Sequence, residues 1–263
     1  MNIVIINKFR GIAFILMFIY HIFIFLKVLT KYNYLNNPFL NFIGIISRNI
    51  FIILVGISLY LSFVNSKNIT EYKKKQLLRS IKIYSIAIYI TILTYFIINN
   101  YYIVFGVLHF ISLSIFILHP FINNIPILLF IFIICILLSN SNYTIPTNPN
   151  SFSNYINGII GFNIYKTTID SFPLIKWIPN IIIGIFIGYF IYYFHKQINK
   201  NNKNNKKNKN TKKIKQKINI IQKIINNEDL LSFIGKNTLL LYIIHIPIIY
   251  IIIKLFIHFF RTY

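Results

Sequence analysis

The sequence has almost no acidic residues. Of 263 residues only four are Asp or Glu, against 27 Lys and Arg, so the formal net charge is +23. No two carboxylates form the pair that glycoside hydrolysis uses. Such a basic balance would suit a nucleic-acid binder, but most of the charge lies in a few blocks separated by long uncharged runs. We therefore predict no nucleic-acid partner.

Cysteine, metal-ligand patterns and phosphate-binding loops are also scarce. Cys135 is the only cysteine, which excludes a disulfide framework within the chain. No spacing of His, Cys and carboxylates resembles a metal site. Gly235-Lys236 lacks the upstream glycine of a P-loop. We predict no metal ion.

The sequence has instead long apolar runs, and 56% of its residues are hydrophobic. A hydrocarbon core ~30 Å thick needs about 20 apolar residues per helix. We therefore predict an all-α, polytopic transmembrane bundle of about seven helices. The first span has no small-residue cleavage site after it, so we interpret it as a retained helix rather than a signal peptide. The predicted spans are 11–29, 43–64, 81–99, 102–119, 121–139, 174–194 and 237–258.

The basic blocks orient these spans. Positive charge gathers on the cytoplasmic side of membrane proteins, and a cytoplasmic N-terminus places segments 1–10, 65–80 and 195–236 on that side. The outside loops then hold only Lys31 and Lys166 as basic residues. This topology predicts an external C-terminus. Span 121–139 is the shortest, and a re-entrant segment is the alternative for it.

Three parts of the chain follow from this topology. Residues 1–194 hold helices one to six, with a long external loop at 140–173, and residues 236–263 hold the last helix of the same domain. Residues 195–235 form a basic cytoplasmic linker, too polar to fold by itself, whose lysines we expect to attract anionic lipids. A specific RNA or lipid site is the alternative for the linker, and 218–231 is a candidate amphipathic helix.

Three histidines lie deep inside the predicted spans, away from their ends. His21, His109 and His245 each fall ~15 Å from the cytoplasmic face, counted at ~1.5 Å per residue. Ionisable groups at that depth usually face a bundle interior. A neutral imidazole can act as a general base or as a nucleophile. We expect the three to converge on one site; the alternative is that each only bonds helices together.

Three arginines and one aspartate mark the two ends of the bundle. Arg10 and Arg79 lie at cytoplasmic helix ends and suit a phosphate-bearing ligand, although positive-inside anchoring explains each equally well. Arg48 lies near the outer interface, where it either snorkels outward or faces a pocket. Asp170 is the only acidic residue on the outer side. Gly184 and Gly188 form a small-xxx-small pair that favours helix packing.

Five segments, in order, resemble motifs of membrane acyltransferases. They are residues 7–21, similar to D-x-x-R-G-[IL]-A…H; Arg48 with 51–58, similar to F-x-F-x-x-G-x-S; 105–111, similar to F-G-[IV]-L-H-x-[IL]; 170–188, similar to D-x-x-P-x-x-P-W…G…G; and 231–245, similar to L-x-x-[IL]-G-[KR]-N-[ST]-L-x-x-Y-x-x-H. The branch that they resemble is related to the catalytic domain of heparan-alpha-glucosaminide N-acetyltransferase.

This resemblance implies transfer of an acetyl group from acetyl-CoA to a sugar or another polar acceptor of the cell envelope. Acetyl-CoA would bind near Arg10 and Arg79, with His21 and His109 as catalytic residues. Arg48, Asp170 and His245 would bind the acceptor. In the heparan-modifying branch a histidine after the first helix is implicated in catalysis, but no histidine lies between His21 and His109 here, so that role is not carried over.

Other functions are compatible with the same spans. The alternatives are a small transporter or permease with an intramembrane histidine site, and a non-catalytic membrane protein. The absence of a visible inverted repeat lowers the transporter hypothesis. We expect an integral protein of a microbial plasma membrane, and leave a homo-oligomer open.

Overall fold

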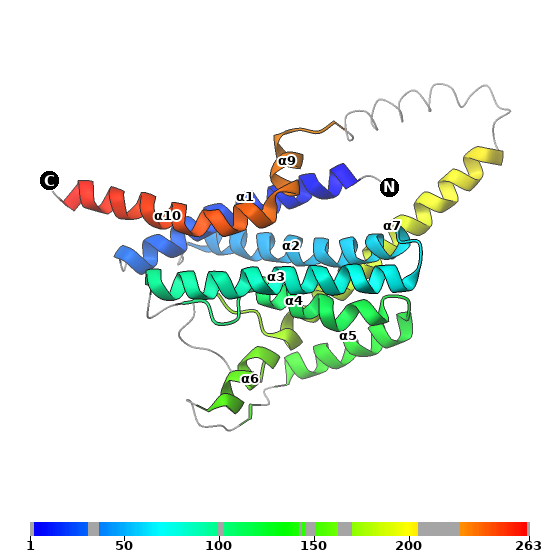
Figure 1. The fold of residues 1–263 in the computed structure, drawn as a ribbon, viewed down its shortest axis with the longest axis horizontal. Coiled ribbons are helices and arrows are strands. Elements are labelled where there is room, and N and C mark those ends of the chain that lie inside the picture. Colours follow the sequence, from blue (N-terminus) through cyan, green and yellow to red (C-terminus); the bar gives the residue numbers. More distant parts are fainter. Residues whose placement is uncertain are drawn as a thin grey trace. The chain divides into compact units, whose positions relative to one another are not determined.

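The computed structural model describes residues 3–30, 37–98, 102–141, 144–145, 151–162, 170–204 and 227–261 (Figure 1). Every regular element in these residues is helical, and one isolated bridge, between Phe105 and Ser171, is their only β pairing. The predicted all-α class is confirmed. Residues 205–226 of the basic linker, and with them most of the predicted 218–231 helix, lie outside the described residues.

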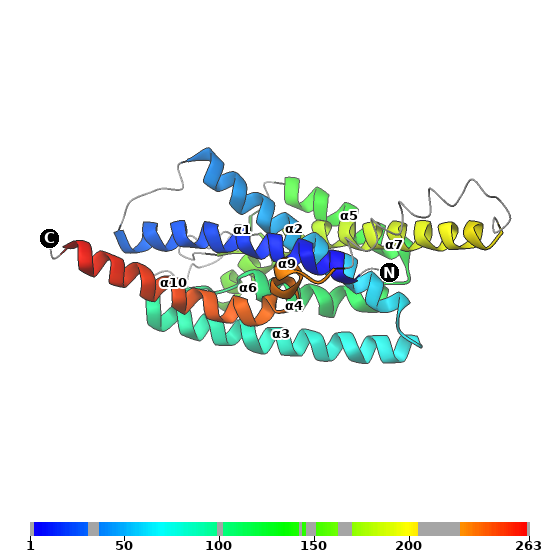
Figure 2. The same cartoon turned by 90° about the horizontal axis from the view of Figure 1, so that it is seen from above.

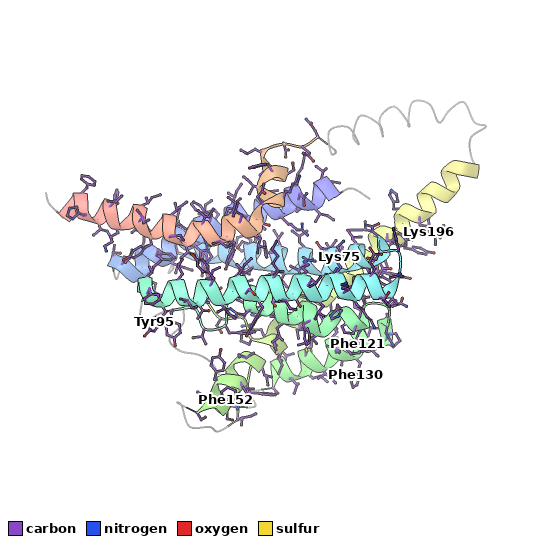
Figure 3. All side chains as sticks on the ribbon, viewed as in Figure 1. Lys75, Tyr95, Phe121, Phe130, Phe152 and Lys196 are labelled. Carbon is purple, nitrogen blue, oxygen red and sulfur yellow. The ribbon has the colours of Figure 1, made fainter. Side chains whose placement is uncertain are left out.

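Five helices in the described part of the chain are long and apolar enough to cross a membrane. They are α1 (Ile3–Thr30), α2 (Pro38–Val64), α3 (Ile69–Ile98), α7 (Leu174–Asn204) and α10 (Thr238–Arg261). Figure 3 labels Lys75 and Tyr95 towards the two ends of α3. Twenty positions separate them, or about 30 Å of helix, the thickness of a hydrocarbon core.

The fourth and fifth predicted spans are shorter helices. α4 (Val107–Leu118) has 12 residues and continues into a 3₁₀ turn, η3 (His119–Phe121), and α5 (Ile125–Asn140) has 16 residues. At ~1.5 Å per residue α4 is about 18 Å long and α5 about 24 Å. Both predicted spans are apolar over their length, but α4 alone is too short to reach across a bilayer.

Large apolar side chains remain exposed along the long helices and α5. Phe96 of α3 is 80% exposed, and Phe130 and Leu137 of α5 are each 65% exposed. Figure 3 labels Phe130. A soluble protein rarely presents so much contiguous apolar surface to water. These side chains are suited to contact lipid, which agrees with a polytopic membrane protein.

The chain divides into two compact units. One contains residues 1–54 and 190–263, and the other contains 55–189. The boundaries fall inside α2 and α7. The first unit therefore holds α1, α9 and α10, and the second holds α3 to α6.

In the first unit, α10 lies along α1, and the short helix α9 (Leu230–Lys236) packs on the N-terminal part of α1 (Figures 1 and 2). Two glycines allow the contact between α9 and α1. A Cβ on Gly235 would collide with the backbone carbonyl of Asn7, and one on Gly11 would collide with that of Leu231. The two helices thus meet backbone to backbone.

A capping box starts α9. The Asp229 Oδ1 accepts the Ser232 backbone N–H at 3.0 Å, and the Ser232 hydroxyl oxygen accepts the Asp229 N–H at 3.0 Å. The reciprocal bonds satisfy donors that a helix start leaves unpaired. Leu231 and Gly235 then contact α1.

In the second unit, α2 and α7 approach closely through glycines. A Cβ on Gly56 would lie 2.9 Å from the Gly184 Cα and would collide with the Ile181 carbonyl. A Cβ on Gly188 would lie 3.0 Å from the Tyr60 Cβ. The predicted packing role of Gly184 and Gly188 is confirmed, because small residues let helix backbones approach.

The predicted start of the fourth span is wrong. Residues 102–106 are not helical, and α4 begins only at Val107, after an extended Gly106. The Ile103 N–H is satisfied by the Thr94 hydroxyl at 3.1 Å, and the Phe105 carbonyl accepts the Phe172 N–H at 3.1 Å. These tertiary bonds replace helical ones, so hydropathy could not reveal the break.

Other helices also begin or end at residues that differ from the predicted bounds. α3 begins at Ile69 and includes much of the basic segment 65–80, and α7 continues ten residues past the predicted end, to Asn204. The 140–173 loop contains a helix, α6 (Phe152–Ile160), which Ser151 caps by accepting the Asn154 N–H at 3.1 Å. Gly161, with φ of 119°, ends it. Hydropathy reports apolar length and therefore misses polar helical extensions.

Candidate functional site

His21 of α1 and His245 of α10 lie side by side in the first unit. The His245 Nε2 is 3.2 Å from the His21 Nδ1, and the ring centroids are 5.0 Å apart. The His245 Nδ1 is 2.7 Å from the Tyr242 backbone carbonyl oxygen. Two of the three predicted histidines therefore form one hydrogen-bonded chain that ends on a helix carbonyl.

Aromatic rings surround His245. The rings of Phe14 and Tyr242 lie 6.1 and 4.9 Å from the His245 ring, and both pack edge-on. His245 is only 2% exposed. Such an enclosure excludes water from the His245 ring.

Arg48 of α2 belongs to the same unit as this pair. Its guanidinium interacts electrostatically with His21. Its Nε donates to the Gly44 carbonyl at 3.1 Å, one turn back in the same helix. The Arg48 side chain is half-buried, and its contact with a substrate stays a prediction.

His109 lies near the start of α4 in the second unit. Its Nε2 is 3.4 Å from the Thr91 hydroxyl, and its ring packs edge-on to Tyr84 at 5.7 Å. Phe105 contributes a third ring, 5.7 Å away. His109 is 6% exposed. His109 lies in the first turn of α4, three residues after Gly106.

Asp170 caps the N-terminal end of α4. Its Oδ2 accepts the Val107 N–H at 3.3 Å, and a Cβ on Gly106 would lie 3.1 Å from that oxygen. A carboxylate at a helix N-terminus is favoured by the helix dipole. The carboxylate therefore has a clear structural contact, in addition to any role with a substrate.

Tyr155 of α6 interacts electrostatically with two tyrosines of the second unit. Burial raises the pKa of Tyr155, and the nearby Tyr84 and Tyr102 add to the effect. Tyr84 is also the ring that packs on His109. Tyr84 thus interacts both with Tyr155 of α6 and with His109.

Arg79 belongs to a buried polar chain on α3. Its Nη1 donates to the Gln76 Oε1 at 3.4 Å, and the Gln76 Nε2 donates to the Ser62 hydroxyl at 2.8 Å. The Tyr72 phenol interacts electrostatically with Arg79. The hydroxyl oxygen of Tyr72 is buried and has no hydrogen-bond partner among the described residues. This arrangement binds α3 to α2 whether or not Arg79 also meets a ligand.

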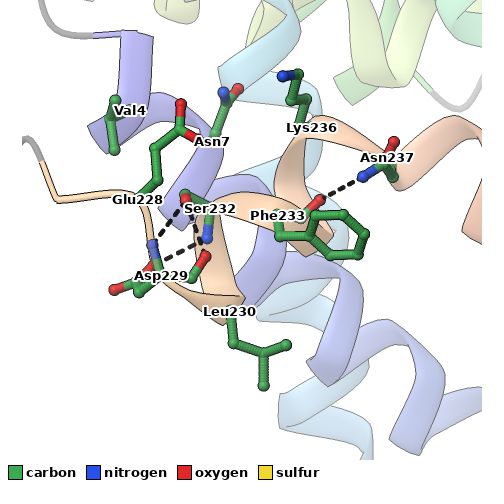
Figure 4. Close-up of a pocket in the computed structure, with 9 residues that line it drawn as sticks. All are labelled: Val4, Asn7, Glu228, Asp229, Leu230, Ser232, Phe233, Lys236 and Asn237. Atoms are coloured by element: carbon green, nitrogen blue, oxygen red, sulfur yellow. Dashed lines mark hydrogen bonds between the residues drawn. The ribbon is translucent and has the colours of Figure 1, made fainter.

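Arg10 lies at the N-terminal end of α1, where its Nη1 donates to the Asn7 Oδ1 at 3.2 Å. A cavity of about 480 Å³ opens beside this end of α1 (Figure 4). Its wall carries Glu228 and Lys236, which are of opposite charge, so the cavity does not select for phosphate. The lining residues are Val4, Asn7, Glu228, Asp229, Leu230, Ser232, Phe233, Lys236 and Asn237.

The sequence analysis did not predict the side chains that contact His109. Thr91 and Tyr84 contact His109, but a threonine or tyrosine within an apolar helix gives no signal in sequence alone. His119 is a further buried histidine, and its Nδ1 lies 2.9 Å from the Phe116 carbonyl oxygen. It resembles a helix-end cap more than a reactive group. The described residues contain no group of three His, Cys, Asp or Glu that could hold a metal ion.

Comparison with known proteins identifies one family. The family model described as "Heparan-alpha-glucosaminide N-acetyltransferase, catalytic" matches residues 3–247. No curated protein and no solved structure matches the chain. The matched range includes His21, His109 and His245.

Proposed function

Because this chain belongs to the family of the heparan-alpha-glucosaminide N-acetyltransferase catalytic domain, we propose that it moves an acetyl group from acetyl-CoA to a sugar or another polar acceptor of the cell envelope. The family and the apolar helices together indicate an integral membrane protein of the acetyltransferase type. The donor, the acceptor and the plasma membrane of a microbe are parts of the proposal.

The observation that supports the proposal best is the contact between His21 and His245. A buried neutral imidazole can take a proton from an acceptor hydroxyl or amine. The acceptor oxygen or nitrogen then attacks the thioester carbonyl carbon, the C–S bond breaks, and the CoA sulfur receives the proton. A transient acyl-imidazole is the alternative path.

The remaining candidate residues take their roles from the same proposal. Arg10 and Arg79 would hold the phosphates of the donor, since a guanidinium offers a planar fork of donors. Arg48 and Asp170 would contact the acceptor. His109 is the second catalytic candidate, because it is buried at the start of α4 with a threonine hydroxyl as its neighbour.

The test is acetyl transfer by the purified protein in proteoliposomes. Labelled acetyl-CoA is supplied, and acetyl-CoA hydrolysis, exchange with free CoA and transfer to sugar acceptors are measured. We expect H21A to lower turnover by about 100-fold or more, the usual contribution of a general base. H195A and H258A are matched controls, because both histidines are exposed, and they should leave turnover unchanged. Full activity in both H21A and H109A would overturn the proposed mechanism.

A proton-coupled transporter is the second candidate, because hydrogen-bonded histidines within spans also form proton relays. It predicts proton or solute flux across the proteoliposome membrane without acetyl-CoA turnover. Flux that H21A abolishes, in a protein that never consumes acetyl-CoA, would favour the transporter.

A further inference from the structure

The tautomer of His245 is determined by the backbone of its own helix. Its Nδ1 lies 2.7 Å from the Tyr242 carbonyl oxygen, which can only accept a hydrogen bond. The Nδ1 must therefore carry the proton. In a neutral ring the Nε2 then carries the lone pair and can only accept.

This constraint passes to His21. Its Nδ1 lies 3.2 Å from the His245 Nε2, so the His21 Nδ1 must be the donor of that bond. The lone pair of a neutral His21 is then on its Nε2. We propose that His245 is a positioning residue that holds His21 in this tautomer and so selects Nε2 as the basic atom. The inference rests on the proposed function for the reaction it serves, but the tautomer can be tested without it.

A histidine fits this orienting role better here than a carboxylate would. In a Ser-His-Asp triad a buried aspartate accepts the Nδ1–H of the reactive histidine. α1 and α10 contain no Asp or Glu. A neutral imidazole accepts the same bond without the cost of burying a full charge among apolar side chains. The aromatic rings around His245 then restrict its rotation.

The consequence for acetyl transfer can be followed atom by atom. The His21 Nε2 takes the proton of the acceptor hydroxyl while the oxygen forms its bond to the thioester carbon. The resulting imidazolium keeps its Nδ1–H on the His245 Nε2. When the C–S bond breaks, the CoA sulfur takes the Nε2 proton, and His21 returns to its starting tautomer.

The test is ¹⁵N solid-state NMR of histidine-labelled protein in lipid bilayers, with His21 signals assigned from their loss in H21A. We expect the neutral His21 ring to carry its proton on Nδ1. In H245Q the Gln Oε1 can replace the His245 Nε2 as acceptor, so the tautomer should persist. In H245L no acceptor remains, and His21 should shift towards the Nε2–H form that free histidine prefers. H258L is the matched control on the same helix.

Turnover of acetyl-CoA in the same variants separates positioning from packing. We expect H245L to lower turnover by about 100-fold, the order of a general-base contribution, and H245Q to restore most of it. In an H21A background H245L should cause no further loss. A His21 proton on Nε2 in the unmodified protein, or an unchanged tautomer in H245L, would contradict the positioning role of His245. If the expected tautomers are found but acetyl-CoA is not turned over, the proposed function is rejected and the positioning role of His245 remains supported.

Discussion

The Lys8 ammonium of α1 lies 2.9 Å from the Oδ2 of Asp229, the residue that caps α9. The same carboxyl group thus receives the Ser232 backbone N–H through Oδ1 and a cation through Oδ2. Together with the backbone contact at Gly235, this ion pair fixes α9 on the N-terminal end of α1.

The ion pair predicts an acid-sensitive docking of α9. The hydrogen bond from Lys8 and the Ser232 N–H lower the pKa of Asp229 below its ordinary 3.8. A carboxyl group with a lowered folded-state pKa stabilises the fold above its unfolded pKa and loses this contribution as pH falls through the folded value. We expect a small effect, because both side chains are partly exposed to solvent.

Thermal unfolding of the detergent-solubilised protein, recorded from pH 7 to pH 3, checks this prediction. D229N and K8M should lower the melting temperature slightly at pH 7, and their difference from the unmodified protein should narrow as the pH falls towards 3. K236M is the control, because Lys236 is an exposed lysine of α9. An equal difference between D229N and the unmodified protein at pH 7 and at pH 3 would contradict the linkage.

Gly235→Ala should separate α9 from α1. The added methyl group collides with the Asn7 carbonyl, which belongs to helix backbone and cannot rotate away. Overpacking of this kind costs about 1–3 kcal/mol, so we expect a lower melting temperature. Faster proteolysis next to α9 should accompany it. Phe233→Ala is the control, since Phe233 is 63% exposed, and stability equal to that of the control would show that α9 is not packed as described.

Two substitutions at Asp170 separate capping from substrate binding. Asp170→Ala removes the acceptor of the Val107 N–H and should cost about 0.5–2 kcal/mol, as the loss of a helix cap does. Asp170→Asn keeps an acceptor oxygen and should keep most of the stability. Thermal unfolding and acetyl transfer are measured on both. Normal activity in Asp170→Asn would assign the carboxylate to capping alone, and loss of activity at normal stability would assign its charge to the substrate.

Arg79→Gln should weaken donor binding if the guanidinium holds phosphate. A hydrogen bond to a charged group contributes about 1.5–3 kcal/mol, so KM for acetyl-CoA should rise by about 10- to 100-fold. Lys75→Gln, on an exposed position of the same helix, should leave KM unchanged. Because Arg79 also bonds Gln76, the melting temperature is recorded in parallel. A lower melting temperature with unchanged KM would show a purely structural arginine.

Much of the helical scaffold could be predicted from the sequence. Five predicted spans appear as helices long enough to cross a bilayer, since apolar length is written directly in the residues. The glycine pair at 184 and 188 was also predicted to pack helices. The start of α4 was not predictable, because Tyr102 to Phe105 are as apolar as a helix but bond instead to Thr94 and Phe172.

The site shows the same division. Sequence alone determined which ionisable residues lie within apolar spans, because an uncompensated polar group there is costly and therefore conspicuous. It could not determine which of them meet. Only the tertiary structure placed His245 against His21, more than two hundred residues away in the sequence. It also placed the Asp170 carboxylate where it accepts the Val107 N–H at the start of α4. The physical reason is that hydropathy reports how deep a residue lies, whereas hydrogen bonds depend on how each helix is rotated and packed.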